Sequence, residues 1–257
     1  MVLFRIEDNV GIITLNRPKV YNSFNREMAL EMQQCLGDCA TNADVRAIYI
    51  TGAGKAFCAG QDLQEIAGPD NSPSFKTILG EHYNPIVRRL RSIEKPIVCG
   101  VNGVAAGAGA NIALACDITV AAESASFIQA FSKIGLIPDS GGTFTLPRLI
   151  GLQKATALMM LGEKVMAKEA ERLGMIYRAI PDDTFAAKSL AIAQKLATMP
   201  TKGLGFTKRA LNRSMTNTWE EQLEVEDELQ SAAGDTYDYR EGVAAFLEKR
   251  KPVFRGE

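Results

Sequence analysis

A glycine-dense turn at residues 103–109 limits the folds available to this chain, because it separates an apolar run from an alanine-rich segment. The apolar run at 97–101 is typical of a buried strand, and residues 108–115 are typical of a helix. Strand, glycine turn and helix in this order leave unpaired N–H groups at a helix start, where they can bind a negative oxygen. Close packing of the helix on a sheet would explain the same glycines without a ligand.

A second glycine turn, with the sequence PDSGG, follows at residues 138–142. It places the carboxylate of Asp139 just before a predicted helix. A set of backbone donors and one acid is enough to move protons next to a carbonyl group. Aspartate is also a favoured N-cap of helices, so a purely structural role for Asp139 stays open.

A third motif, AFCAGQDL at residues 56–63, directly follows a predicted strand at 45–51. Its small residues allow a ligand to approach the backbone, and Gly60 permits unusual dihedral angles. A plain strand-to-helix turn is the alternative. Cys58 as a nucleophile would need an activating histidine, and none lies nearby in the sequence, which favours a packing role.

The balance of charges argues against nucleic acid as a partner. Lys and Arg number 29, Asp and Glu number 30, and the net charge is -1, whereas phosphate binding usually requires a basic excess. The first residues lack a basic segment followed by an apolar one, and no apolar run reaches the roughly 18 residues of a membrane span. We therefore expect a cytoplasmic protein with no membrane partner.

The cysteine and histidine content argues against a metal site. There are 5 cysteines, none in CxxC spacing, and His82 is the single histidine. We expect no metal, and thiols that stay reduced. A Ser-His-Asp triad would need His82, and no nucleophile elbow lies near it.

The first half of the chain alternates strands and helices, which favours an α/β fold. Besides the runs above, it predicts a strand at 10–15, helices at 25–40 and 79–91, and a loop at 66–76. The later part is helical, with a capping box at residues 218–221. Its predicted helices span 152–162, 167–174, 183–199, 202–214, 219–233 and 239–249.

This pattern predicts two regions. An α/β core with the site occupies residues 1–190, and a helical C-terminal region occupies residues 191–257.

Together the three motifs resemble those of the crotonase superfamily, also called the enoyl-CoA hydratase/isomerase family. The resemblance covers nearly the whole chain, from LNRP at residues 15–18 to EGVAAFLEKR at residues 241–250. It implies a spiral core of strand-strand-helix units and a helical C-terminal trimerisation region. It also implies an acyl-CoA substrate, with CoA entering as part of the thioester and no separate cofactor. The implied assembly is a homotrimer or a dimer of trimers.

The resemblance also implies which residues form the site. Two backbone N–H groups, carried over to Cys58 and Ala108, would bind the thioester carbonyl, and Asp139 completes the catalytic set. An enolate oxygen between such donors makes the neighbouring carbon acidic. The implied substrate-binding residues are Ala56, Gly60, Gln61, Asp62, Leu63, Gly107, Asn111, Phe131, Pro138 and Gly142.

The acid/base positions of the family then indicate the reaction. Its hydratases carry two glutamates, and the matching positions here are Asn111 and Phe131, so water addition is not expected. Asp139 is at the position used by several family isomerases, and the segments are most similar to those of isomerases that convert a ring-epoxide CoA thioester to an oxepin-CoA. Two alternatives stay open: a Δ3,Δ2-enoyl-CoA isomerase of fatty-acid oxidation, and a non-catalytic member that binds acyl-CoA or RNA.

Two effects on the Asp139 carboxylate oppose each other. An apolar pocket would raise its pKa, and a helix start at residues 141–143 would lower it. We expect the group to be ionised at neutral pH.

Overall fold

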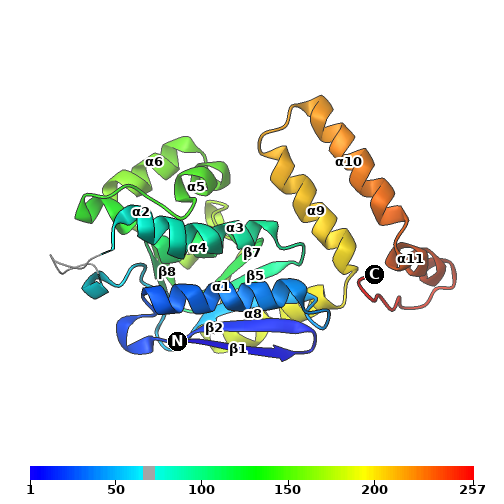
Figure 1. The fold of residues 1–257 in the computed structure, drawn as a ribbon, viewed down its shortest axis with the longest axis horizontal. Coiled ribbons are helices and arrows are strands. Elements are labelled where there is room, and N and C mark those ends of the chain that lie inside the picture. Colours follow the sequence, from blue (N-terminus) through cyan, green and yellow to red (C-terminus); the bar gives the residue numbers. More distant parts are fainter. Residues whose placement is uncertain (66–72) are drawn as a thin grey trace.

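The computed structural model describes residues 1–65 and 73–257, and a six-stranded sheet crosses its centre (Figure 1). The predicted loop at 66–76 lies partly outside these residues. The strand order is β1-β2-β3-β5-β7-β10, with β1 and β2 antiparallel and the other neighbours parallel. Its strands are β1 (Val2–Glu7), β2 (Val10–Leu15), β3 (Ala47–Gly52), β5 (Ile97–Val101), β7 (Ile118–Ala122) and β10 (Arg178–Ile180).

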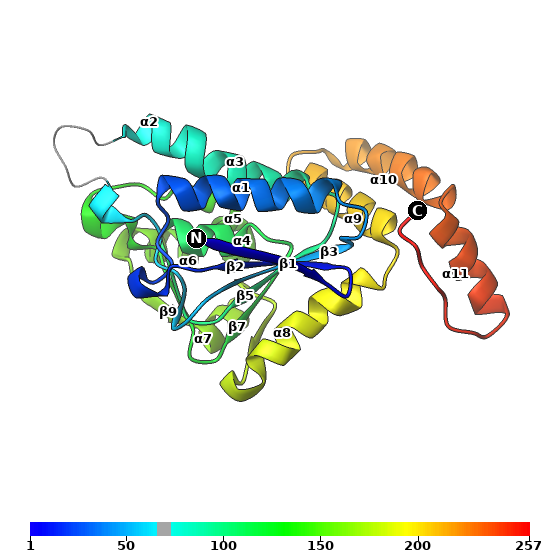
Figure 2. The same ribbon diagram turned by 60° about the horizontal axis from the view of Figure 1, so that its bottom comes forward.

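Helices cover both faces of this sheet, as parallel strands require. Side chains alternate along β2: Ile13 and Leu15 join the main core, while Val10 and Ile12 join a second cluster. Figure 2 shows the two layers, with α1 and α3 on one side of the strands and α8 on the other. The covering helices are α1 (Arg26–Thr41), α3 (Asn84–Ser92) and α8 (Asp182–Ala197).

A second, smaller sheet has the order β4-β6-β8-β9. Three times the chain passes from a strand of the large sheet to a short strand of the small sheet and then to a helix, which confirms the predicted spiral of strand-strand-helix units. The short strands are β4 (Ala56–Cys58), β6 (Val104–Ala106), β8 (Ser126–Ile128) and β9 (Lys164–Met166), and the helices after β6 and β8 are α4 (Ala108–Leu114) and α5 (Gly142–Ile150).

The helix predicted at 79–91 is longer and irregular. It begins with α2 (Phe75–Thr77), where the Ser74 side chain accepts a hydrogen bond from Thr77 N, and continues through a π-helical turn, η3 (Ile78–Tyr83), into α3. The π-helical turn shifts the side chains that follow it relative to a regular α-helix.

The C-terminal helices form as predicted. They are α6 (Leu152–Leu161), α7 (Ala167–Arg172), α9 (Thr201–Ser214), α10 (Trp219–Gly234) and α11 (Tyr237–Leu247). The capping box of Thr218 and Glu221 opens α10. Figures 1 and 2 show α9 to α11 extending beyond one end of the sheet. The predicted division between the two regions falls at residue 190, inside α8. It stays a prediction.

Among the described residues, no helix combines the length and the apolar character needed to cross a membrane.

Candidate active site

A cavity of about 200 Å³ lies where the end of β4, the start of α4 and the π-helical turn meet. The structure brings seven of the predicted site residues to its wall: Gly60, Gln61, Leu63, Gly107, Ala108, Phe131 and Asp139. Among the described lining residues, Asp139 supplies the one carboxylate and Lys133 the one cation.

Two residues of this wall carry backbone N–H groups that have no acceptor among the described residues. Ala108 is the first residue of α4, so its N–H has no acceptor within the helix. Gln61 also lines the cavity, and no acceptor for its N–H is found in the described part of the chain. Gly60 allows the two segments to approach: a Cβ there would lie 3.0 Å from Ala106 O and 3.5 Å from Ala108 N.

Cys58 lies behind this wall rather than in it. It is fully buried, ends β4 and pairs with Ala105, and its Sγ accepts a hydrogen bond from Gly60 N at 3.4 Å. Burial raises the pKa of its thiol to about 12, so the thiol is protonated at neutral pH. The structure therefore does not bring Cys58 to the cavity, because its main chain belongs to the small sheet, and Gln61 of the same motif lines the cavity instead.

Asp139 is half-buried, and burial raises the pKa of its carboxylate, while a hydrogen bond from the Ser140 hydroxyl at 2.9 Å opposes that rise. The N-cap of α5 is Gly141, and no side chain caps this helix. The structural role considered for Asp139, helix capping, is therefore wrong. The carboxylate is left available to the cavity.

Asn111 supports the backbone that carries Asp139. It is only 1% exposed, its Nδ2 donates to Asp139 O at 2.8 Å, and its Oδ1 accepts from Gln129 Nε2 at 2.8 Å. A Cβ at Gly142 would clash with the Asn111 amide, so this glycine makes room for the contact. Asn111 does not line the cavity; Phe131 does.

The other predicted binding residues also lie outside the cavity wall. The Asp62 carboxylate forms an ion pair with Arg17 Nη2 at 2.8 Å, and Ala56 O accepts from Asn22 Nδ2 at 2.8 Å. These contacts tie the segment after β2 to the AFCAGQDL motif. Asp62 through its carboxylate and Ala56 through its main-chain oxygen therefore hold neighbouring segments together rather than facing the cavity. Pro138 and Gly142 flank the wall without forming it.

Sequence reasoning missed the residues that the irregular helix brings to the cavity, namely Phe75, Ile78 and Tyr83. The Tyr83 hydroxyl donates to Gln61 Oε1 at 2.8 Å. The sequence predicts a regular helix here, and a π-helical turn has no periodic pattern by which it could be recognised.

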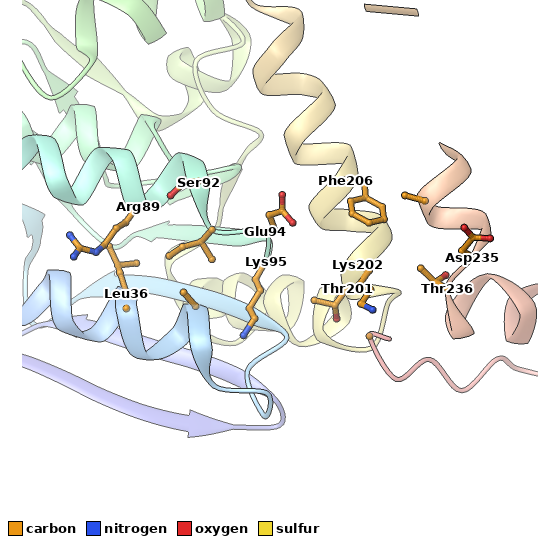
Figure 3. Close-up of a pocket in the computed structure, with 15 residues that line it drawn as sticks. Leu36, Arg89, Ser92, Glu94, Lys95, Thr201, Lys202, Phe206, Asp235 and Thr236 are labelled. Atoms are coloured by element: carbon orange, nitrogen blue, oxygen red, sulfur yellow. The ribbon is translucent and has the colours of Figure 1, made fainter. Parts of the chain in front are cut away.

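A larger cavity, of about 640 Å³, lies between α1 and α3 on one side and the C-terminal helices on the other (Figure 3). It shares no residue with the predicted site. Two of its charged groups are engaged with neighbouring segments: Lys95 Nζ donates to Cys39 O and Asn42 O at 2.7 Å, and Glu94 pairs with Arg209. The combination of backbone donors and a carboxylate occurs in the smaller cavity.

Within the described residues, no group of three His, Cys, Asp or Glu side chains is placed to hold a metal ion.

Comparison with known proteins places this geometry in a family. Residues 5–257 match the sequence profile of the enoyl-CoA hydratase/isomerase family. The 1,2-epoxyphenylacetyl-CoA isomerase of Escherichia coli (strain K12) is 47% identical over 260 residues, covering 100% of this chain and 98% of that protein. A protein of Rhodobacter capsulatus named as a probable enoyl-CoA hydratase is 42% identical, covering 99% of this chain and 98% of its own. The crystal structure of an enoyl-CoA hydratase from Bacillus anthracis matches with a TM-score of 0.93 at 32% identity, covering 100% of this chain and 99% of that one.

The chain belongs to the enoyl-CoA hydratase/isomerase family, and it has the crotonase fold.

Proposed function

We propose that this protein is an isomerase of acyl-CoA thioesters that uses a single carboxylate. The observation that carries the proposal is the cavity wall, where the carboxylate of Asp139 accompanies the backbone N–H groups of Gln61 and Ala108. Backbone donors stabilise the negative oxygen of an enolate, and one carboxylate can take and return the same proton.

The mechanism follows from these groups. The thioester carbonyl oxygen accepts hydrogen bonds from Gln61 N and Ala108 N, and Asp139 removes a proton from a carbon made acidic by that carbonyl. The electrons move onto the oxygen, and the protonated Asp139 returns the proton at a different carbon. The raised pKa of Asp139 supports this role, because it makes the carboxylate a stronger base while leaving it able to ionise.

The two positions that carry glutamates in family hydratases argue against water addition. Asn111 uses its amide to hold Asp139 O and to accept from Gln129, and Phe131 presents an aromatic ring to the cavity. Neither side chain can activate water.

The lining of the cavity favours a substrate with an aromatic or cyclic acyl group, because Phe75, Tyr83 and Phe131 form part of its wall. Together with the 47% identity to a 1,2-epoxyphenylacetyl-CoA isomerase, this favours conversion of 1,2-epoxyphenylacetyl-CoA to oxepin-CoA, a step of phenylacetate catabolism. The same donors and carboxylate would also serve a Δ3,Δ2-enoyl-CoA isomerase, which is the second candidate.

The test is the Asp139→Asn variant assayed with the ring epoxide and with 3-hexenoyl-CoA. Isomerisation should fall at least about 100-fold, since a general base is lost, while binding of hexanoyl-CoA should persist. The matched control is Asp44→Asn, which makes the same change at an exposed position. The ratio of the two wild-type rates separates the two candidates.

Three results would count against the proposal. Near-normal turnover by Asp139→Asn would remove the mechanism. Hydration of crotonyl-CoA at a rate comparable to isomerisation would remove the single-carboxylate assignment. Binding of acyl-CoA without turnover of any tested thioester would leave a non-catalytic binding protein.

A further inference from the structure

A buried tyrosine lies beside the proposed donors and is not used by the mechanism above. Tyr83 is 1% exposed, yet it lines the cavity, and its hydroxyl donates to Gln61 Oε1 at 2.8 Å. It is the last residue of the π-helical turn at Ile78–Tyr83. Such turns carry a cost relative to a regular helix and occur often at functional sites.

The Gln61 side chain is held from both ends of its amide. Its Oε1 accepts from Tyr83, and its Nε2 donates to Glu65 Oε2 at 2.8 Å. Glu65 is fixed in turn, because its Oε1 accepts from Arg26 N at 2.8 Å. These contacts link the start of α1, the AFCAGQDL motif and the π-helical turn.

Phe24 joins the same network through its backbone and its ring. Phe24 N donates to Gly60 O at 2.7 Å, and Asp62 N donates to Phe24 O at 2.8 Å, so the backbone is fixed on both sides of Gln61. The Phe24 ring meets the Tyr83 ring edge-on, with centroids 5.9 Å apart. Gly60, with φ of +95°, precedes the Gln61 peptide and adds no steric restraint of its own, so these contacts are what hold the peptide in place.

We propose that Tyr83 is a positioning residue: through the Gln61 side chain, its hydroxyl keeps the Gln61 N–H aimed at the thioester oxygen. The proposal rests on the isomerase function above and deepens it. The neighbouring glycine adds no steric restraint of its own, so the direction of this peptide depends on the Phe24 and Tyr83 contacts, and a donor contributes fully only when its direction is fixed before the reaction. Burial, helped by nearby carboxylates such as Asp139, raises the pKa of Tyr83, so the hydroxyl remains a donor over the working pH range.

The experiment compares Tyr83→Phe with Tyr49→Phe. Tyr49 is also buried, and its hydroxyl lies 2.7 Å from Ser189 Oγ on the α8 side of the sheet, so its loss removes a similar bond far from the cavity. Gln61→Met is the second variant, because it keeps the backbone N–H and the chain length but removes both polar ends. Folding of each variant is checked by circular dichroism.

Two readouts respond to donor direction and not to packing. The first is the ratio of kcat to KM effects: Tyr83→Phe should lower kcat about 10-fold with little change in KM, which is less than complete loss of an oxyanion donor. The second is the infrared carbonyl band of bound phenylacetyl-CoA labelled with ¹³C at the thioester. Wild type should shift this band to lower frequency, and Tyr83→Phe should reverse part of the shift.

The double variant Tyr83→Phe/Gln61→Met should be no worse than Gln61→Met alone, because both changes break one connection. Tyr49→Phe should leave kcat and the carbonyl band unchanged. If Tyr83→Phe lowers only the melting temperature, or if the two changes add independently, Tyr83 is a core residue and the inference is wrong.

Failure of the proposed function would look different. A wild-type protein that shifts the carbonyl band but turns over no thioester would remove the isomerase assignment, and a reversed shift in Tyr83→Phe would still support the positioning role.

Discussion

At the scale of single residues, Asp139 is fixed through its main chain rather than through its carboxylate. Its carbonyl oxygen accepts hydrogen bonds from Asn111 Nδ2 and Gly142 N, both at 2.8 Å. Its side chain accepts from the Ser140 hydroxyl. The group is therefore held in position while its proton affinity is set mainly by burial.

The raised pKa of Asp139 predicts two opposite pH dependences. Activity should fall as the pH drops through the raised pKa, because the base becomes protonated, and the residual activity of Asp139→Asn should not show this fall.

The free energy of unfolding depends on pH in the opposite direction: between the ordinary value of 3.8 and the raised pKa, the folded state binds more protons than the unfolded state. The contribution of Asp139 to stability is thus present at acid pH and lost as the pH rises. Thermal unfolding from pH 4 to 7 should show Asp139→Asn gaining stability relative to wild type; a constant difference would contradict the buried carboxylate.

Substitutions at Cys58 and Gln61 should have unequal effects, although both belong to one motif. Cys58→Ala should keep most activity, because its protonated thiol lies outside the cavity. Gln61→Pro removes the proposed donor and should lower kcat about 10²–10³-fold. Steady-state assays on variants that retain native circular dichroism check this, and an inactive Cys58→Ala would favour a thiol mechanism.

At the scale of elements, the site depends on how closely α4 approaches β4. Gly109 lies in the first turn of α4, where an added Cβ would come within 2.7 Å of Cys58 Cβ and Sγ. The glycine therefore serves the close packing considered from the sequence. It also bears on the position of the neighbouring Ala108 N–H, so the same close contact serves the packing and the proposed donor.

Gly109→Ala should push α4 away from β4. We expect a destabilisation of about 1–3 kcal/mol, typical of overpacking, together with a loss of kcat, because the Ala108 N–H moves. Gly37→Ala in α1 is the control, since no atom lies within 4 Å of the added Cβ, and it should be neutral or stabilising. Chemical denaturation and assays on both variants test this; an active, stable Gly109→Ala would contradict the close contact.

The elements also explain what the sequence predicts and what it does not. Long helices with strong caps, such as α10, and the buried strand β5 were predicted close to their observed bounds. The strands β4 and β6, of 3 residues each, are too short to show a periodic pattern, so only the family resemblance, and no pattern in the residues, indicated the second strand of each unit. Of the three catalytic residues that the resemblance implies, Asp139 and Ala108 line the cavity and Cys58 does not, because Cys58 pairs with Ala105 in the small sheet.

At the scale of the whole molecule, apolar side chains on the C-terminal helices face solvent. Phe246 is 83% exposed and Leu247 73% at the end of α11, and Trp219 is 75% exposed at the start of α10. Large exposed apolar groups of this kind mark interaction surfaces. They agree with the homotrimer or dimer of trimers that the family resemblance implies, which stays a prediction.

Sedimentation or light scattering should give three or six times the chain mass of 27.9 kDa. Phe246→Asp should shift the protein toward smaller species, because it places a charge on the proposed interface. Leu3→Asp, at an exposed position on β1, should leave the mass unchanged. A monomeric wild type at micromolar concentration would remove the prediction.

The backbone origin of the two proposed oxygen-binding donors bears on how such a protein can change its reaction over evolutionary time. Apart from proline, a substitution at residue 61 or 108 leaves the N–H in place, so mutation can redesign the acyl pocket while thioester activation persists. The proposed proton-transfer group, Asp139, is borne by a separate loop, and the family resemblance implies that positions 111, 131 and 139 are three alternative places for such a group. A new activity can then arise by moving one carboxylate to another position. The intermediate variants would keep the backbone donors that activate the thioester carbonyl.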